Sequence, residues 1–148
     1  MNRRLYLYVL VVISARVHFD SYGQKFGATD VKGDMHLWRF DSNTVGSKPF
    51  LTLNCHDTIA RDFAFLGSSS VVATTGTSGD GGNLAIWDTL LPKEKAQAQC
   101  YKVHDRGGYS LAFSKRHQLL VSGGRDGEIC MRACIDSLLP TMNVKVEQ

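Results

Sequence analysis

The chain has little of several features that define particular classes of protein. It holds only 3 prolines against 14 glycines among 148 residues, and this balance favours a turn-rich all-β chain over a low-complexity one. The formal net charge is only +3. Since no segment concentrates the positive charge, the sequence gives no indication of nucleic-acid binding. The hydrophobic content of 43% is sufficient for a packed core.

Disulfide and metal-binding spacings are also missing. The four cysteines are Cys55, Cys100, Cys130 and Cys134, and none forms a Cys-x-x-Cys pair. We therefore expect free thiols in a reducing compartment. His56, His104 and His117 together with Cys130 and Cys134 could be drawn as a zinc site, but such sites usually show two closely spaced ligand pairs. We expect no metal and no cofactor, and we interpret Cys130 as a buried strand residue.

Residues 1–14 differ in character from the rest of the chain. The segment "MNRRLYLYVLVVIS" has two arginines and then an apolar run from Leu5 to Ile13, which is the outline of a signal peptide. The run is too short to span a membrane as a helix, and its Tyr, Val and Ile residues equally favour a buried strand. No Asn-x-Ser/Thr sequon follows, which opposes secretion. We expect no direct membrane insertion, and secretion stays the alternative.

Three segments of the chain align with one another. They are Ala15–Phe40, Cys55–Leu90 and Val103–Ala133. Each reads as a strand, a short turn, a second strand ending in small residues, a glycine turn and a third strand. Trp38, Trp87 and Arg132 end the third strands at spacings of 49 and 45 residues, and His56 and His104 are 48 residues apart. A period somewhat above 40 residues is typical of the four-stranded blades of a β-propeller.

The packing of blades explains the run "NLAIWD" at residues 83–88. A blade lies between two others, so its inner strands are covered on both faces and should be apolar on both. Leu84 and Ile86 point one way, and Ala85 and Trp87 point the other. A buried indole N–H needs a partner. A Ser or Thr on the preceding strand, linked to an early His and a turn Asp, supplies one and locks strands and turn together.

At these residues the sequence resembles the WD-repeat family. In the third segment, His104, Ser122 and Asp126 stand where the family places its structural His, hydroxyl and turn Asp, while Arg132 occupies the Trp position. The first segment keeps Trp38 but has Lys32 at the Asp position and no clear upstream His.

The second segment matches the family at the His, hydroxyl and Trp positions, although its turn "GTSGDGG" is two residues longer than that of the third. The network that the resemblance implies is structural, with no catalytic and no metal-binding residue. It comprises Trp38, His56, Thr75, Asp80, Trp87, Asp88, His104, Ser122 and Asp126.

The amino-acid sequence of the repeats points to one particular family of WD-repeat proteins. "FGATDVKGDMHLWRF", "CHDTIARDFAFLGSSSVVATTG", "GNLAIWDTLLP" and "HQLLVSGGRDG" together resemble the C-terminal propeller of the DmX-like, or rabconnectin, family. The resemblance implies a very large cytoplasmic scaffold, associated with vacuolar-type proton pump assembly, organelle acidification and synaptic vesicles. Its expected partners are pump subunits and scaffold subunits, at endosomal, vacuolar or synaptic-vesicle membranes.

We therefore predict an all-β fold: a partial β-propeller of about three WD-repeat blades of antiparallel strands at residues 15–133. An unmatched apolar segment (1–14) precedes it and a non-repeat tail (134–148) follows. A closed ring needs about four to eight blades, so we expect a fragment of a larger propeller.

The leading functional hypothesis is a non-catalytic protein-interaction module. An unrelated WD-repeat adaptor is the first alternative, and an enzyme on a β-scaffold is the second. Ser110, His104 and Asp105 can be drawn as a nucleophile system, but no Gly-x-Ser-x-Gly elbow is present. The glycine-rich stretch "GTSGDGGN" lacks the Lys-Ser/Thr ending of a phosphate-binding loop. We therefore expect no enzymatic activity.

Overall fold

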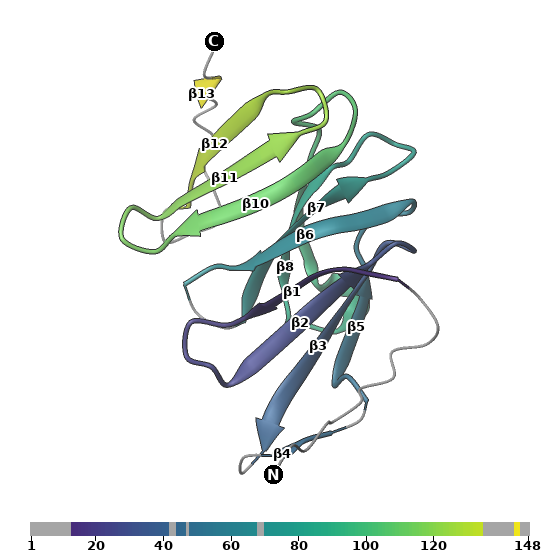
Figure 1. Ribbon diagram of the computed structural model, residues 1–148, viewed down its shortest axis with the longest axis vertical. Coiled ribbons are helices and arrows are strands. Elements are labelled where there is room, and N and C mark those ends of the chain that lie inside the picture. The colour runs from purple at the N-terminus through teal and green to yellow at the C-terminus, as the bar shows by residue number, and fades with distance from the viewer. Residues whose placement is uncertain (1–12, 42–43, 47, 68–69, 135–143, 146–148) are drawn as a thin grey trace.

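The computed structural model describes residues 13–41, 44–46, 48–67, 70–134 and 144–145. These residues form three antiparallel sheets that follow one another along the chain (Figure 1), which confirms the predicted partial propeller. The expectations for residues 1–12, and for nearly all of the tail after residue 134, fall outside the described residues. None of the described helices is long and apolar enough to cross a membrane.

Each sheet begins with its innermost strand. The first blade comprises β1 (Ser14–Phe19), β2 (Lys25–Asp30), β3 (Asp34–Asp41), β4 (Thr44–Val45) and β5 (Leu51–Asn54). The second comprises β6 (Ile59–Phe65), β7 (Val71–Thr77), β8 (Leu84–Asp88) and β9 (Gln97–Tyr101), with the 3₁₀ turn η1 (Lys93–Lys95) before β9. The third comprises β10 (Gly108–Ser114), β11 (Leu119–Gly124), β12 (Ile129–Ala133) and β13 (Val144–Lys145). The second and third sheets are meanders, and in the first sheet β3 pairs with both the short β4 and β5.

The blades stack face to face, and at both contacts the same face of the later blade packs against the blade before it. The face of the second blade that carries Trp87 and Val72 packs against Met35, Leu37 and Leu53 of the first. The corresponding face of the third blade, which carries Leu120, packs against Ala73, Leu84 and Ile86 of the second. Strand β8 is thereby buried on both faces, as its continuous apolar run predicts. Each fully buried Leu or Met contributes about 1.5–3 kcal/mol relative to exposure.

A glycine turn allows the first and second blades to approach closely. Gly33 has φ +94°, and a Cβ placed there would meet the carbonyl oxygen of His56 at 1.6 Å. That approach lets the Gly33 carbonyl accept hydrogen bonds from the backbone N–H groups of Cys55 (2.8 Å) and His56 (3.1 Å). A side chain at position 33 would disrupt both the turn and the start of the second repeat.

Candidate functional site

The second blade contains a polar network centred on a buried threonine. The Trp87 indole N–H donates to Thr74 Oγ1 at 2.8 Å, and His56 Nε2 lies 3.1 Å from the same oxygen. Because the indole already donates to this oxygen, the Thr74 hydroxyl hydrogen is free to donate to His56 Nε2. His56 Nδ1 then carries the proton and faces the Gly82 carbonyl at 3.3 Å. The network joins β7, β8 and the segment that leads into β6.

The structure corrects the threonine that the sequence indicated. Thr75 does not lie between His56 and Trp87, and its hydroxyl instead donates to the Asn83 carbonyl at 2.7 Å. The strand register explains the difference. Val72 is paired with Trp87, and residues two apart share a face of a strand, so Thr74 stands on the tryptophan face and Thr75 on the opposite one.

The two other polar residues predicted in the second blade serve their own turns. Asp80 does not reach His56: its carboxylate accepts the Gly82 N–H at 2.8 Å. The Ser78 hydroxyl stands near His56 Nδ1 instead, at 3.3 Å, because the longer turn carries Asp80 further along the chain. Asp88 accepts the Leu90 N–H at 3.0 Å and is likewise outside the threonine network.

Burial controls the protonation of His56. Removal from water lowers the pKa of the imidazole, and this outweighs the opposing effects of its hydrogen bonds and of Asp57 and Asp80. The neutral form of His56 is therefore favoured. This agrees with the hydrogen bond from Thr74, because His56 Nε2 can accept the hydroxyl hydrogen only when it carries no proton.

The third blade brings His104, Ser122 and Asp126 together. His104 Nε2 lies 2.9 Å from Ser122 Oγ, and Nδ1 lies 3.4 Å from Asp126 Oδ1. The Asp126 carboxylate also accepts the N–H groups of Glu128 (3.0 Å) and Asp105 (2.9 Å). Burial alone would raise the pKa of Asp126, but these two donors and the nearby His104 outweigh it, so the pKa lies below its ordinary value.

Arg132 replaces the tryptophan of this blade and leaves the network incomplete. Its side chain is buried, with the residue only 6% exposed, and its guanidinium carbon lies 3.7 Å from the centre of the Tyr101 ring on β9. Its Nε and Nη1 atoms are buried and have no hydrogen-bond partner within the described part of the chain. The guanidinium therefore packs against the second blade by stacking on the Tyr101 ring and by its interaction with the Tyr101 hydroxyl, while Nε and Nη1 make no hydrogen bond of the kind that Trp87 makes.

The first blade uses a different set of residues. Trp38 is buried, but its indole nitrogen has no hydrogen-bond partner among the described residues. Ala28 lies opposite His36 in the register, in the place of Thr74, and it has no hydroxyl to offer. His36 instead contacts Asp30 Oδ2 at 2.9 Å and Thr52 Oγ1 at 3.0 Å. The sequence analysis did not predict either contact of His36.

Asp30, Asp34 and His36 also form the single group of metal-ligand-type side chains found within residues 13–41, 44–46, 48–67, 70–134 and 144–145. Their ligand atoms lie within 4.8 Å of one another. Asp30 Oδ1 already accepts two backbone N–H groups, and Asp34 accepts the Asn54 amide at 2.8 Å. These hydrogen bonds account for the cluster as part of the β2–β3 turn.

Two polar residues that the sequence did not single out connect neighbouring blades. Asp62 on β6 lies 2.9 Å from His18 Nε2 on β1 and accepts the Leu111 N–H on β10 at 2.9 Å. Asn83 accepts the N–H groups of Val103 and His104 and donates to the His104 carbonyl. The position of Asp62 in the middle of the largely apolar strand "IARDFAF" is the one sequence feature that could have indicated its role.

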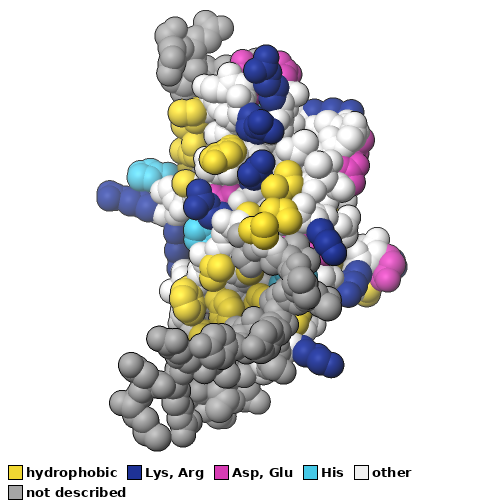
Figure 2. All heavy atoms as spheres, turned by 45° about the vertical axis from the view of Figure 1, so that its right-hand side comes forward, with side chains coloured by type: hydrophobic (Ala, Val, Ile, Leu, Met, Phe, Trp, Pro, Cys, Tyr) yellow, Lys and Arg dark blue, Asp and Glu magenta, His cyan; other side chains and the backbone are white. Residues whose placement is uncertain are grey.

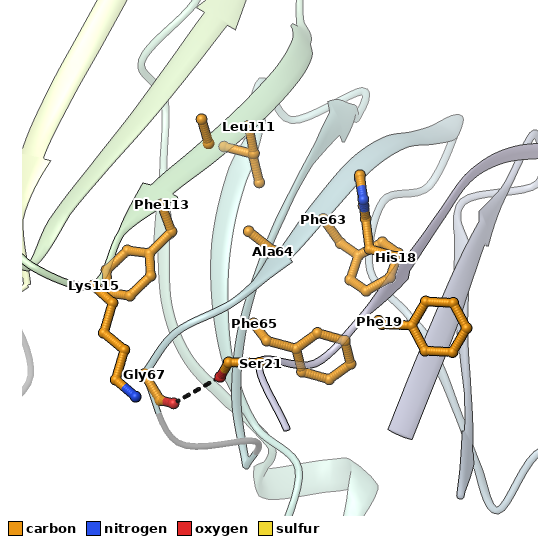
Figure 3. A pocket seen from close by; sticks show the side chains of 11 residues that line it. His18, Phe19, Ser21, Phe63, Ala64, Phe65, Gly67, Leu111, Phe113 and Lys115 are labelled. Carbon is orange, nitrogen blue, oxygen red and sulfur yellow. Dashed lines mark hydrogen bonds between the residues drawn. The ribbon is translucent and has the colours of Figure 1, made fainter. Parts of the chain in front are cut away.

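The innermost strands form a shallow groove of about 330 Å³ (Figure 3). Phe19, Phe65 and Phe113 stand at matching positions near the ends of β1, β6 and β10, each paired with the second residue of the next strand. His18 packs edge-on against Phe63 with ring centres 5.2 Å apart. The groove is largely apolar, with Lys115 at its edge (Figure 3).

The four cysteines are free thiols. Burial raises the pKa of Cys55, Cys100 and Cys134 above the ordinary value for a thiol. Raised values keep these side chains in the unreactive thiol form at neutral pH.

Comparison with known proteins agrees with this geometry. The family model "WD domain, G-beta repeat" matches residues 96–131, which run from the last strand of the second blade into β12 of the third. DmX-like protein 1 of Mus musculus is 40% identical over 121 residues, covering 78% of this chain and 4% of that protein. The human protein of the same name is 39% identical over 127 residues, covering 79% and 4%.

The chain thus contains a match to the WD repeat and is similar to DmX-like protein 1 over most of its length. It spans about 4% of the length of the mouse and human proteins. Cilia- and flagella-associated protein 337 B of Tetrahymena thermophila is 28% identical over 137 residues, covering 86% of this chain and 10% of that protein. The WD repeat and the similarity to DmX-like protein 1 indicate a non-enzymatic, scaffold-type family whose repeats mediate contacts between proteins.

Proposed function

We propose that this WD-repeat chain is a non-catalytic interaction module that takes part in assembling the vacuolar-type proton pump. It acts from the cytoplasm, at the surface of endosomal, vacuolar or synaptic-vesicle membranes, and contacts pump subunits and other scaffold subunits. The observation that carries the proposal is the 40% identity to DmX-like protein 1 over 121 residues. The association of that family with the pump is what the resemblance implies.

The contacts and burial of His56 and His104 support a non-catalytic role. His104 Nε2 contacts Ser122, while its Nδ1 is buried 3.4 Å from Asp126 Oδ1 and makes no hydrogen bond in the described ranges. His56 is engaged by Thr74 and the Gly82 carbonyl. A general base must reach the proton that it abstracts, and both imidazoles are instead buried within the strands that they connect.

Exposed apolar side chains support a role in binding proteins. Val17 and Phe19 lie on the same face of β1 and are 58% and 62% exposed. Leu90 and Leu91 lie between β8 and β9 of the second blade, and both are exposed. Clusters of this kind mark interaction surfaces more often than single exposed residues do.

The experiment is affinity capture from animal cells that express the tagged 148-residue chain. Blots for vacuolar-type proton pump subunits should be positive, and a Val17→Asp, Phe19→Asp double variant should recover less of them because it alters the exposed face of β1. The matched control is Lys93→Ala, an exposed change in η1. Absence of pump subunits from the wild-type capture, with the chain shown to be folded, would contradict the proposal.

A second candidate is a WD-repeat adaptor in a different assembly. The similarity to the Tetrahymena protein, which is named as cilia- and flagella-associated, favours it. Enrichment of axonemal proteins in place of pump subunits in the same capture would select this candidate.

A further inference from the structure

The three innermost strands share an irregularity at the same point. The register shifts between Ser14 and Arg16 in β1, between Ala60 and Asp62 in β6, and between Gly108 and Ser110 in β10. Each shift marks a β-bulge, which leaves one residue outside the regular pairing and redirects its side chain. The bulged residues of β6 and β10 are Arg61 and Tyr109, and Arg16 directly follows the bulge of β1.

These bulges surround a cavity of about 250 Å³, here called the arginine cavity. It lies where the three strands begin, at the opposite end from the groove of Figure 3. The side chains used below are Ile13, Arg16, Val31, Ile59, Arg61 and Tyr109. Figure 2 shows one face of the molecule, on which Lys and Arg side chains stand beside hydrophobic ones.

The charge of the arginine cavity is unbalanced. Arg16 and Arg61 both line it, and none of the described lining residues is acidic. Arg61 Nε is buried and without a hydrogen-bond partner in the described ranges, while its guanidinium carbon lies 5.5 Å from the centre of the Tyr109 ring. Stacking on Tyr109 holds the guanidinium in place, and a planar guanidinium held in this way is suited to binding a carboxylate.

The size and surroundings of the cavity limit what it can hold. It is smaller than the roughly 300–1,000 Å³ of pockets for drug-sized ligands, and Ile13, Val31 and Ile59 make much of its wall apolar. Asp57 and Asp105 lie exposed in the loops that precede β6 and β10, and their charges disfavour a polyanion such as nucleic acid. A single carboxylate with apolar neighbours fits these conditions.

We propose that the arginine cavity binds an aspartate or glutamate side chain within an extended, otherwise apolar segment of a partner protein. The carboxylate pairs with Arg61 and Arg16, and the flanking apolar side chains pack on Ile13, Val31, Ile59 and the Tyr109 ring. This inference rests on the proposed role as a protein-interaction module, but it does not depend on which assembly the module serves.

The test uses the folded 148-residue chain and an array of ten-residue peptides. Each peptide places Glu, Gln, Lys or phosphoserine at its centre, among randomised Leu, Ile, Val, Ser and Gly. We expect about tenfold more retention of the chain on Glu than on Gln peptides, which is the effect of one charge-assisted contact. The preference should weaken as NaCl is raised from about 50 to 500 mM, because salt screens charges at a surface.

Variants of the two arginines test whether the preference for Glu over Gln peptides comes from the arginine cavity. The Arg16→Ala, Arg61→Ala double variant should lose it, and Arg61→Lys should keep only part of it because the planar fork is gone. Arg16→Ala alone changes an exposed side chain and should reduce the preference at least about threefold even if the double variant fails to fold. Arg116→Ala, in the β10–β11 turn, is the matched control and should behave as wild type.

Equal retention on Glu and Gln peptides would overturn the proposal, as would a preference that survives loss of both arginines. Stronger binding to phosphoserine peptides, or to a single-stranded oligonucleotide followed by anisotropy, would also overturn it, because the ligand would then be a phosphate. A failure to capture pump subunits in cells would contradict only the proposed assembly role and would leave the peptide result standing.

Discussion

The second and third blades place a histidine and a hydroxyl in equivalent positions but differ in what completes the arrangement. In the second, Trp87 donates to the same hydroxyl that contacts the histidine. In the third, Arg132 occupies the tryptophan position with two buried nitrogens that find no partner in the described ranges, while Asp126 braces the turn. The polar network of the second blade therefore mainly joins strands to one another, and that of the third mainly stabilises its turn.

The largest effect should come from removing the hydroxyl of the second blade. Thr74→Val keeps the shape of the side chain but leaves His56 and the Trp87 indole without their shared partner. Each buried group left unpaired costs about 1–3 kcal/mol, so we expect a loss of about 2–4 kcal/mol in urea unfolding. Thr75→Val should cost less, since it removes one hydrogen bond. An equal or larger loss for Thr75→Val would contradict the placement of Thr74 at the centre.

Replacing Arg132 should strengthen the third blade. Arg132→Met removes a buried charge whose Nε and Nη1 are unpaired, and exchange of buried charges for apolar groups of similar volume is often neutral or stabilising by about 1–4 kcal/mol. Loss of stacking on Tyr101 opposes this gain, so we expect about 1–2 kcal/mol of stabilisation in the same unfolding measurement. A clear destabilisation would show that the contact with Tyr101 outweighs the cost of burying the cation.

The two turn aspartates should differ in importance. Asp126→Ala removes the acceptor of two backbone N–H groups and the carboxylate near His104, and should cost about 1–3 kcal/mol. Asp80→Ala removes the acceptor of the Gly82 N–H and should cost about 0.5–1.5 kcal/mol. Thermal unfolding of the two variants side by side checks the order. Equal losses would mean that Asp80 has a second role in the second blade.

The smallest effect concerns pH and the second blade. The pKa of His56 is lowered by burial, so the unfolded chain binds a proton at higher pH than the folded chain does. The contribution of neutral His56 to the free energy of unfolding is therefore fully present above the unfolded pKa of about 6.5. It is lost as the pH falls from there through the lowered folded pKa. The change is at most about 1.4 kcal/mol per pH unit for one proton. His56→Gln should flatten the decline in unfolding midpoint between pH 7 and 5, and an unchanged slope would contradict a neutral buried His56.

The sequence predicted the fold more completely than the network. The repeat spacing and the two-sided apolar strands were sufficient for three antiparallel blades, because burial against neighbours dictates composition strongly. The hydroxyl of the second blade was misplaced by one residue. Position along a strand determines which face a side chain takes, and the longer turn between β7 and β8 hid the register that assigns Thr74 and not Thr75 to the face of Trp87.

The partners in the polar contacts between blades could not be predicted from the sequence. Asp62 meets His18 and the backbone of Leu111 across three strands, and the residues involved are 44 and 49 positions apart. Nothing local in the sequence pairs them. The replacement of Trp by Arg at position 132 was visible, but its stacking on Tyr101 of the neighbouring blade depends on how the sheets stack.

The indole N–H groups of the two tryptophans report whether a hydroxyl-centred network is complete in the second blade and incomplete in the first. The chain has only these two indoles, so a nitrogen-15 spectrum shows each one separately. We predict that the Trp87 N–H, bonded to Thr74, is shifted downfield and exchanges with solvent more slowly than the Trp38 N–H, and that Thr74→Val removes this difference. Equal shifts and exchange rates in the wild-type chain would contradict it.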